Sequence, residues 1–348
     1  MKKKIYIENA TEIKHSIGQL FDAFGLNDLK NRRVFVKPNM LRIAQPEECV
    51  ITDPQLIEWT VDYLLKNAAI VSVGDNPIPQ PLNEVEVARQ CGFLKASQGH
   101  FKNIGRYVKK IRLKHKSVKE IYVSRDILYA DILISLPKFK THELTILSIA
   151  IKNHFGIIPG GIKPHLHSRC ASLEDFCKLL LEVYNQKKSD LIIVDAINVR
   201  DVNNHLFRLN KIIVGNDPWA IEYVCSLIAD LKPEYHPLLK IGMKEKLFDP
   251  DDFEVLGTLE PIKGFCLPPG LFLRNIFSGI GSRLFAKIQD AKITYIDHML
   301  CNKCRACENV CPTRVINNFK IDNKKCIKCY CCFEVCPTGA IKKKLKII

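Results

Sequence analysis

A doubled cysteine motif near the C-terminus constrains this chain more than any other feature of its sequence. The segment CNKCRACENVCP covers residues 301–312 and CIKCYCCFEVCP covers residues 326–337, so the pattern C-x2-C-x2-C-x3-C-P occurs twice. The two copies contain eight of the chain's 15 cysteines. Disulfides would need an oxidising compartment, and zinc sites commonly use two C-x2-C pairs rather than a doubled triplet. The spacing instead favours thiolates that surround iron–sulfur cubes.

The same spacing predicts which cysteines share a cluster. Three closely spaced thiolates bind three corners of one cube, and a short helical turn carries the fourth cysteine to the other cube. One 4Fe–4S cluster is therefore predicted to be bound by Cys301, Cys304, Cys307 and Cys336. The second is predicted to be bound by Cys326, Cys329, Cys332 and Cys311.

Residues 293–348, which contain both copies, resemble the two-cluster ferredoxin module. The resemblance implies a small α+β domain in which a short hairpin connects the two motifs. Lysine and arginine side chains near the cysteines would favour reduced clusters and would suit an acidic redox partner protein. We therefore expect a C-terminal ferredoxin-like domain that transfers electrons.

Charge and hydropathy exclude several classes of protein. The formal net charge is +15, and two clusters with their thiolates would lower it by about 4, to about +11. Lysine-rich runs at residues 2–4, 109–119 and 342–346 accompany no nucleic-acid motif, so we expect a solvated basic surface and no nucleic-acid partner. No stretch of 18 apolar residues occurs, and no apolar run follows the N-terminal lysines. We predict no transmembrane segment, no signal peptide and a cytoplasmic location.

Residues 1–262 alternate between strand-like and helix-like segments. Apolar, β-branched strands such as those in KKKIYIE and DLIIVDAINV are separated by helical patterns, one of which begins at Asp53 with Pro54 next to it. This alternation predicts an α/β domain, a largely parallel sheet flanked by helices. Residues 263–292 form a connector in which the apolar residues of 271–289 repeat as in an amphipathic helix. That helix could pack on the α/β domain, or it could contact a membrane or a partner.

Polar residues gather where the predicted strands end, the edge at which parallel sheets bind ligands. The substrate-binding candidates at this edge are Lys37, Asn39, Lys140, Asn153 and Asp195. The catalytic candidates are His142 and His167, as general acids, and Lys152. Two alternatives stay open. Polar residues are common in turns, so each strand-end residue could be an ordinary turn residue. Lys152 follows an apolar, helix-like run at 146–151, so its side chain could extend to the surface.

The histidines of residues 165–167 form an H-x-H pair that would share one face of a strand and could then bind a metal. A third metal ligand is not evident in the sequence. No G-x-G-x-x-G follows a predicted strand, so NAD is not expected, whereas a flavin held without this fingerprint is compatible with the sequence.

Four short motifs in a fixed order resemble the family of domains of unknown function that is numbered 362. They are KPN (37–39), PKFKTH (137–142), IKNHFG (151–156) and VDAIN (194–198). The resemblance covers about residues 1–345 and implies an α/β core, a role in the redox metabolism of anaerobic microbes and a C-terminal ferredoxin module. The chain departs from the family after DAI, where NVRDVNNHLFRLN replaces a glycine-bearing stretch, and this weakens the expectation that Asp195 binds a ligand.

Together these features favour an oxidoreductase. Electrons from two 4Fe–4S clusters would reach a small polar or anionic substrate, not identified by the sequence, at the strand ends of the α/β domain. An electron-transfer subunit that docks an acidic redox partner and a cluster-based redox sensor are the alternatives. A closed pocket containing Lys37, His142 and Lys152 would favour the enzyme, whereas a flat strand-end edge would favour the subunit.

Overall fold

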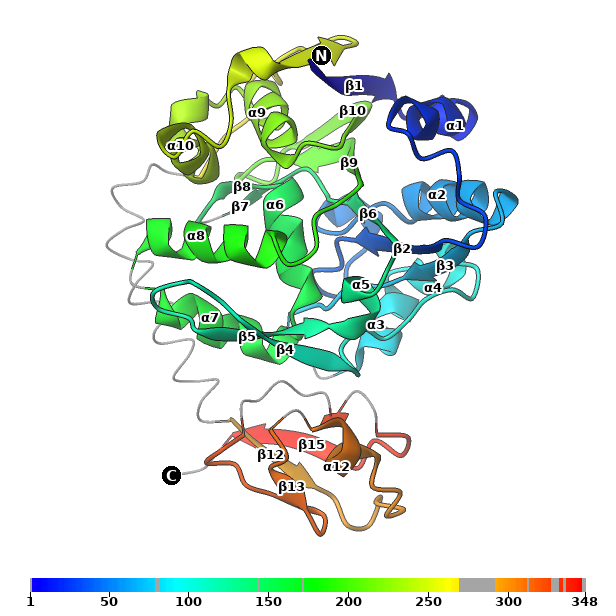
Figure 1. The fold of residues 1–348 in the computed structure, drawn as a ribbon, viewed down its shortest axis with the longest axis vertical. Helices are drawn as coiled ribbons and strands as arrows, with labels where there is room; N and C mark the ends of the chain where they lie inside the picture. Colours follow the sequence, from blue (N-terminus) through cyan, green and yellow to red (C-terminus); the bar gives the residue numbers. More distant parts are fainter. Residues whose placement is uncertain are drawn as a thin grey trace.

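The computed structural model describes residues 2–78, 82–142, 144–170, 172–268, 292–311, 313–326, 332–333 and 336–345 (Figure 1). The predicted helix at 271–289 and the predicted cluster ligand Cys329 lie outside these residues. No helix among the described residues is long and apolar enough to cross a membrane.

A seven-stranded sheet forms the centre of the larger part of the chain. From one edge to the other its strands are β11 (Phe253–Leu256), β1 (Lys3–Asn9), β10 (Leu206–Gly215), β9 (Leu191–Arg200), β6 (Ile132–Leu136), β2 (Arg33–Pro38) and β3 (Ile70–Val73). Strand β10 pairs antiparallel with both of its neighbours, whereas β11–β1, β9–β6, β6–β2 and β2–β3 are parallel pairs. The predicted largely parallel sheet is confirmed.

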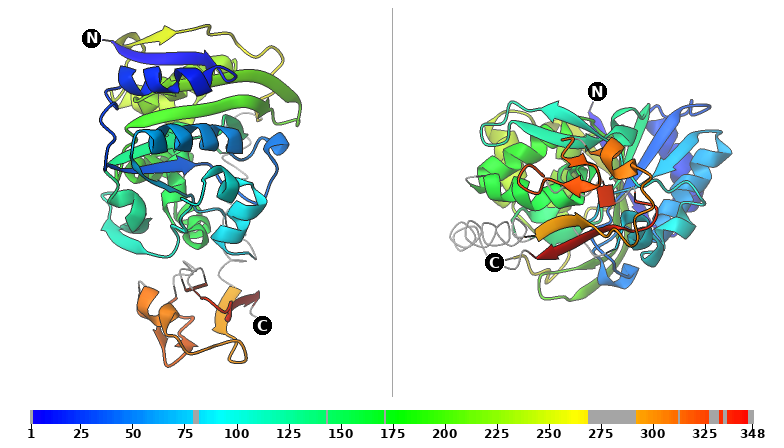
Figure 2. Two further views of the ribbon diagram at one scale, coloured as in Figure 1. Left: turned by 90° about the vertical axis from the view of Figure 1, so that its right-hand side faces the viewer. Right: turned by 90° about the horizontal axis from the view of Figure 1, so that it is seen from below.

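Alternating side chains of the strands build a core on each face of the sheet. Val34 and Val36 of β2 pack against helices α1 (Ile13–Ala23), α2 (Pro54–Lys66), α3 (Glu84–Gln90) and α4 (Phe93–Ala96). Phe35 points to the opposite face, which is covered by α8 (Leu173–Tyr184), α9 (Pro218–Ile228) and α10 (Pro237–Lys244). Figure 2 shows α1 and α2 in front of the sheet in its left panel. Each fully buried Val, Leu, Ile or Phe contributes about 1.5–3 kcal/mol.

Asp53 begins α2 as predicted. Its carboxylate accepts the backbone N–H of Gln55, and Pro54 occupies the first helical position, where a missing N–H costs nothing.

The segment 146–169 differs from the expected apolar helix. It consists of β8 (Ile146–Ser148), α6 (Ala150–Asn153), two 3-10 turns (His154–Ile157 and Gly160–Ile162) and α7 (Lys163–Arg169). Strand β8 pairs with β7 (Lys140–His142). This pairing uses the backbone N–H and C=O groups of residues 146–148 that a helix would have bonded internally. The H-x-H pair lies on α7, not on a strand, so its histidines do not share one face.

The remaining elements of the larger part are short. They are the 3-10 turns Pro46–Glu48, Pro233–Tyr235 and Pro250–Asp252, the hairpin β4 (Val108–Arg112) with β5 (Glu120–Ser124), and α5 (Arg125–Leu128). The C-terminal part is a small α+β module. It contains α12 (Ala306–Val310) and two antiparallel pairs, β12 (Lys292–Ile296) with β15 (Ile341–Leu345) and β13 (Ile316–Asn317) with β14 (Lys320–Ile321).

A buried glutamate anchors α6, the short helix that carries two of the predicted site residues. The Glu222 carboxyl group on α9 accepts the backbone N–H of Ile151 at 2.9 Å and lies 3.5 Å from the buried His236 ring. Burial raises the pKa of Glu222 to about 8, although the N–H groups of Ile151 and Ala150 oppose the shift. The neutral carboxyl group therefore satisfies the first turn of α6 without a buried charge.

Replacing Glu222 with glutamine should change how stability depends on pH. Because the folded-state pKa is raised from the ordinary 4.5 to about 8, wild type has its full stability below pH ~4.5 and loses stability as pH rises to about 8. Glu222→Gln lacks this loss, so its stability relative to wild type should increase by on the order of 1 kcal/mol per pH unit between pH 5 and 8. Urea unfolding followed by tryptophan fluorescence would measure the trend, because both tryptophans lie in residues 1–262. An exposed control, Glu234→Gln, should not reproduce it, and a flat difference for Glu222→Gln would contradict the assignment.

Candidate functional site

A cavity of about 780 Å³ opens where the parallel strands end. Residues that follow β2, β3 and β6 line it together with α6, α7 and the end of β9. Six of the eight sequence-predicted substrate and catalytic residues line this cavity: Asn39, Lys140, His142, Lys152, Asn153 and His167. The sheet order explains the convergence, because β9, β6, β2 and β3 are consecutive and run in the same direction.

Lys37 does not line the cavity, because it is fully buried behind the cavity wall. Its Nζ donates to Asp75 Oδ1 at 2.6 Å and to Asn153 Oδ1 at 3.3 Å. The second oxygen of Asp75 accepts the backbone N–H of Met40 at 2.7 Å. Lys37, which the sequence predicts to bind a ligand, instead joins the ends of β2 and β3 to α6 beneath the cavity.

Asp195 also lies behind the cavity. Its carboxylate accepts from Lys138 Nζ at 2.9 Å and from the backbone N–H of Asp53 at 2.7 Å, and both members of the ion pair are buried. Asp195 therefore anchors the start of α2 to the sheet rather than facing a ligand. Two ion pairs, Lys37–Asp75 and Lys138–Asp195, neutralise the charges beneath the cavity.

Three other lysines face the cavity without such neutralisation. Lys140, Lys152 and Lys163 line it, and no carboxylate among the described residues lies within ion-pairing distance of any of them. Lys140 Nζ donates to Asn39 Oδ1 at 3.0 Å and to the carbonyl of Val50 at 2.9 Å. Lys163 donates to the carbonyl of Asn76. The wall is therefore rich in cationic groups that an anionic ligand could neutralise.

Burial and mutual repulsion lower the pKa values of these lysines. Burial, followed by the charge of Lys152, lowers the pKa of Lys140 to about 7. Burial, followed by the charge of Lys163, lowers the pKa of Lys152 to about 7. Burial lowers the pKa of Lys163 to about 8, against the attraction of Asp75. At neutral pH, the cavity is therefore partly protonated and can take up protons when an anion binds.

The two candidate histidines have different surroundings. His142 Nε2 lies 2.7 Å from Lys152 Nζ, and the Nδ1 of the same ring accepts backbone N–H groups. The His167 ring stacks on Phe176, with ring centroids 4.0 Å apart, and burial followed by the charge of Lys152 lowers its pKa to about 3. His167 is therefore neutral at pH 7 and is a weaker candidate for a general acid than the sequence suggests.

Among the described residues, groups of side chains that could hold a metal include neither His165 nor His167. Those groups are His115 with Cys170 and Asp175, and Asp201 with His205 and Cys266. In both groups, a hydrogen bond already brings the histidine and the aspartate together. His115 Nε2 lies 2.8 Å from the Asp175 backbone carbonyl, and His205 Nδ1 lies 3.0 Å from Asp201 Oδ2.

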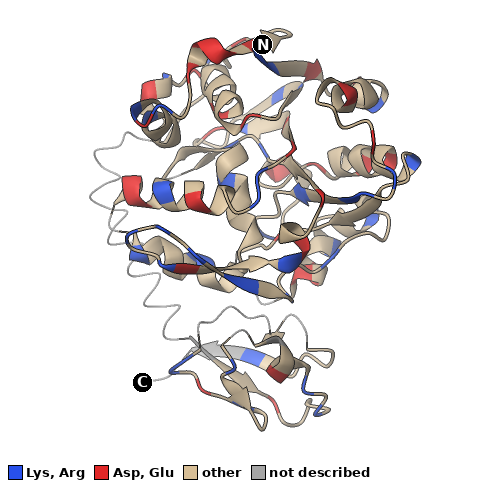
Figure 3. Cartoon of the chain, in the orientation of Figure 1, with Lys and Arg blue, Asp and Glu red and all other residues tan. Residues whose placement is uncertain are grey.

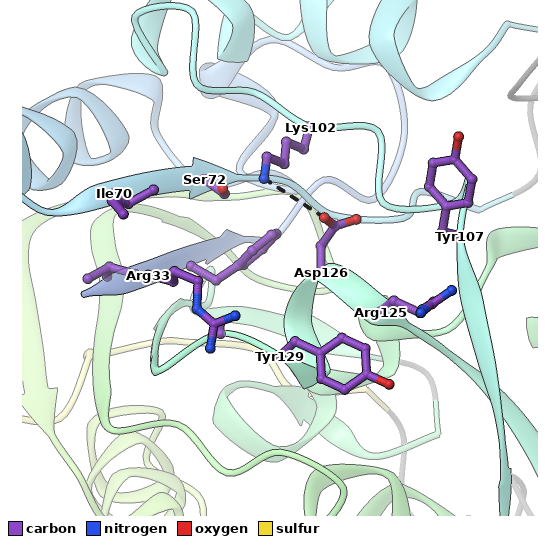
Figure 4. A pocket seen from close by; sticks show the side chains of 11 residues that line it. Arg33, Ile70, Ser72, Lys102, Tyr107, Arg125, Asp126 and Tyr129 are labelled. Carbon is purple, nitrogen blue, oxygen red and sulfur yellow. Dashed lines mark ion pairs between the residues drawn. The ribbon is translucent and has the colours of Figure 1, made fainter. Parts of the chain in front are cut away.

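A second, smaller cavity of about 380 Å³ lies at the opposite ends of β2 and β3, near Arg33 and Ile70 (Figure 4). An ion pair between Lys102 and Asp126, 3.9 Å long, crosses it. None of the sequence-predicted site residues lines this cavity. Its position at the strand starts and its small size make it the weaker candidate for a substrate site.

The cysteines of the C-terminal module gather in one hydrophobic cluster. Cys307 and Cys332, from different copies of the motif, are buried there, and Cys301, Cys311 and Cys336 pack against them. Cys307 and Cys336 are close enough that their charges interact, although burial is the main reason that the pKa of Cys307 is raised. Cys307 and Cys336, which the spacing assigns to one cluster, are therefore near each other.

The loops around these cysteines suit an anionic cluster. The Cys336 sulfur accepts the backbone N–H of Ala340 at 3.2 Å. Burial alone would raise the pKa of Cys336, but hydrogen bonds from Ile341, Thr338 and Ala340 hold it below its ordinary value. Lys303 and Arg305 have φ angles of 57° and 58°, a conformation that turns backbone N–H groups toward a common centre. The donor set and these loops fit thiolate-bound 4Fe–4S clusters.

Basic residues do not gather on one element (Figure 3). Lysines and arginines are spread over β2, β4 and other elements, and they alternate with acidic residues on α8.

Sequence reasoning did not select several residues that shape the cavity. Arg200, at the end of β9, lines it and donates to the carbonyls of Glu47 and Asn204 at 2.9 and 2.7 Å. Lys163 follows the loop Pro159–Gly161, and nothing in the sequence shows that this lysine lines the cavity. Gly156 belongs to the IKNHFG motif, but nothing in the sequence reveals that it lies against the Lys37–Asp75 pair.

Two family models match the chain. The family described as "Domain of unknown function (DUF362)" matches residues 34–226, and "4Fe-4S binding domain" matches residues 294–317 and 319–342. The two repeats indicate an iron–sulfur protein with an electron-transfer role and 4Fe–4S clusters.

Two individual proteins are also similar to the chain. A thylakoid-associated protein of Synechocystis sp. is 26% identical over 218 residues, which cover 60% of this chain and 66% of that protein. The chain thus spans slightly less than two thirds of this relative. The lactate racemase apoprotein from Thermoanaerobacterium thermosaccharolyticum has a TM-score of 0.43 and 14% identity, covering 66% of this chain and 57% of that one. A similarity at this level supports no inference about function.

Adding one methyl group at Gly156 should disturb the support beneath the cavity. A Cβ there would overlap Asp75 Oδ1 and lie 2.6 Å from Lys37 Nζ, so it would separate a buried ion pair. We expect Gly156→Ala to lower the free energy of unfolding by at least about 3 kcal/mol. Urea unfolding followed by tryptophan fluorescence would measure the loss.

Gly25→Ala is the matched control. Gly25 has a φ of 71° and no atom within 4 Å of its Cβ position, so only backbone strain of about 1–2 kcal/mol is expected. Equal losses in the two variants would show that the contact with the ion pair is unimportant.

Proposed function

Because the chain belongs to the family described as domain of unknown function DUF362 and carries two 4Fe–4S binding repeats, we propose that it is an iron–sulfur oxidoreductase. Its substrate is a small anionic molecule that binds in the strand-end cavity. The observation that carries this proposal is the set of three lysines that face the cavity without a carboxylate partner among the described residues. Buried cations without partners are costly, and an anionic ligand would remove that cost.

The residues of the cavity divide into two roles in this proposal. Lys140 and Lys163 bind the anionic group of the substrate, because their ammonium groups line the cavity and are held by carbonyl oxygens. Asn39 keeps Lys140 in place, since its Oδ1 accepts from Nζ while its Nδ2 donates to the carbonyl of Val50 at 2.6 Å. Asn153 is similarly oriented by Ser135 and Lys37. His142 and Lys152 form the pair that would exchange protons with the substrate.

The C-terminal module would hold the clusters through the cysteines of both repeats. When bound, two 4Fe–4S clusters would supply single electrons at potentials that hydrogen bonds to sulfur adjust. We assign Cys301, Cys304, Cys307 and Cys336 to one cluster, and Cys326, Cys329, Cys332 and Cys311 to the other. The electrostatic interaction between Cys307 and Cys336 supports the first set.

An electron-transfer subunit that docks an acidic partner is the second candidate, because the chain has a formal net charge of +15. In that case the cavity would hold no reactant. Reduced, anaerobically purified protein distinguishes the two functions. A co-purifying anion that reoxidises wild type but not a Lys140→Met/Lys163→Met variant would support the enzyme, and equal behaviour of the two proteins would support the subunit.

Anion binding in the cavity should weaken as pH rises. The pKa values of Lys140 and Lys163 are about 7 and about 8, so both lysines lose protons between pH 6.5 and 8.5. We expect the affinity for oxalate, measured by titration calorimetry, to fall at least about tenfold over this range, with proton uptake on binding. Lys140→Met should remove most of the pH dependence, because its pKa of about 7 lies lower in this range than that of Lys163. Lys116→Met, at a side chain that is 76% exposed, should leave it unchanged. Affinity that is independent of pH would contradict the role of these lysines.

Removing one predicted ligand should remove iron from one cluster. We expect Cys304→Ala to lower iron content from about eight to about four per chain and to reduce visible absorbance by about half, because a cube that lacks one thiolate is lost readily. Cys266→Ala is the control, since this cysteine lies outside both motifs. Iron content that stays at about eight per chain in Cys304→Ala would show that Cys304 is not a ligand.

A further inference from the structure

The hydrogen bonds of His142 determine where its ring carries a proton. Its Nδ1 accepts the backbone N–H of Leu144 at 3.0 Å and that of Thr145 at 3.3 Å. A ring nitrogen that accepts an N–H has no proton of its own, so the neutral imidazole carries its proton on Nε2. His142 therefore presents an N–H donor, not a lone pair, at Nε2.

This tautomer determines the state of Lys152. The Nζ of Lys152 lies 2.7 Å from His142 Nε2, within hydrogen-bonding distance. An ammonium group has three donors and no lone pair, so it cannot accept the ring N–H. A hydrogen bond at this distance therefore requires Lys152 to be a free amine whose lone pair accepts the proton of His142.

The other two cavity lysines, Lys140 and Lys163, face oxygen acceptors rather than a ring N–H donor. Lys140 donates to an amide oxygen and a carbonyl, and Lys163 donates to a carbonyl, as ammonium groups do. Two ammonium groups nearby also disfavour a third, and burial followed by Lys163 lowers the pKa of Lys152 to about 7. Titratable groups around Lys152 come from β7, α7 and α8, and they are His142, Lys140, Lys163, His167 and Cys177.

We propose that Lys152 is an uncharged amine nucleophile that condenses with the carbonyl carbon of an oxo acid held in the cavity. The proposal rests on the proposed function in one respect, that the cavity binds a small anionic substrate. Lys140 and Lys163 would bind the carboxylate of the oxo acid, and the amine of Lys152 would face its carbonyl group. Desolvated lysines beside other cations are a known source of such nucleophiles.

The reaction balances without an oxidant or a reductant. The Nζ–C bond forms as the lone pair of Lys152 leaves its hydrogen bond with His142 and attacks the carbonyl carbon. The ring N–H of His142 is then free to donate to the developing oxygen. The oxygen departs as water with the two hydrogens of the amine, and a C=N bond to Lys152 remains.

The protonation state can be tested without a substrate. Trace acetylation of the full-length holoprotein with acetic anhydride, followed by peptide mass spectrometry, would give the titration midpoint of each lysine. We expect Lys152 to react at pH 7 on the order of a hundredfold faster than the exposed Lys116, because about half of Lys152 but very little of an ordinary lysine is neutral there. Lys152 that titrates together with Lys116 would overturn the proposal.

Two His142 variants distinguish the effect of its N–H hydrogen bond on Lys152 from the effect of its ring volume. His142→Phe removes the N–H that stabilises the neutral amine, so the midpoint of Lys152 should rise and its labelling at pH 7 should fall several-fold. His142→Gln keeps a side-chain donor and should restore much of the reactivity. A midpoint that is unchanged in His142→Phe would show that His142 does not control Lys152.

The nucleophilic role has its own test. Holoprotein would be incubated with pyruvate and sodium cyanoborohydride, and the reduced adduct would be located by peptide mass spectrometry. We expect the adduct at Lys152 and its absence in Lys152→Arg. An absent adduct, or equal adducts at Lys140 and Lys163, would overturn the nucleophilic role. An adduct at Lys152 in a protein whose clusters never transfer electrons to a cavity ligand would instead refute the proposed oxidoreductase and leave this inference standing.

Discussion

The buried ion pair between Lys37 and Asp75 is the interaction on which the rest of the cavity depends. It joins residues at the ends of two parallel strands, and neither partner can move to water without leaving the other charge buried and unpaired. Removing one member of such a pair typically costs about 3–5 kcal/mol. Because Asn153 of α6 and the backbone of Met40 bind the same pair, its geometry determines where the surrounding loops lie.

The contrast between paired and unpaired lysines gives the cavity its chemical character. Lys37 and Lys138 have carboxylate partners and serve the fold, whereas Lys140, Lys152 and Lys163 have only neutral hydrogen-bond partners among the described residues. Burial makes each additional charge more expensive, and the pKa values of these three lysines accordingly fall to about 7, 7 and 8. Under the proposals made above, Lys140 and Lys163 would bind an anion and Lys152 would supply a reactive nitrogen, so one residue type would serve both roles.

Local patterns could be read from the sequence, and long-range pairings could not. The ferredoxin-type repeats follow from short cysteine spacing, the largely parallel sheet follows from the alternation of strand-like and helix-like segments, and the family follows from four short motifs, so all three were predictable. Lys37 and Lys140 both lie at or just after strand ends, but only the fold reveals that Asp75, 38 residues away, neutralises the first. The short β8 was read as part of a helix because an apolar run of that length fits either structure.

The long β9–β10 hairpin builds one part of the cavity, and the strand ends of the sheet build the other. Its outer end supplies Arg200, Asp201 and Asn204 to the rim, whereas the floor comes from the buried ends of β2, β3 and β6. At the outer end Asn204 is exposed, but Asp201 is buried and its carboxylate accepts the backbone N–H groups of His205 and Cys266. The segment that departs from the family pattern, NVRDVNNHLFRLN, therefore contributes three residues to the cavity lining, so the access of a ligand to the lysines would depend on a part of the chain that the family motifs do not describe.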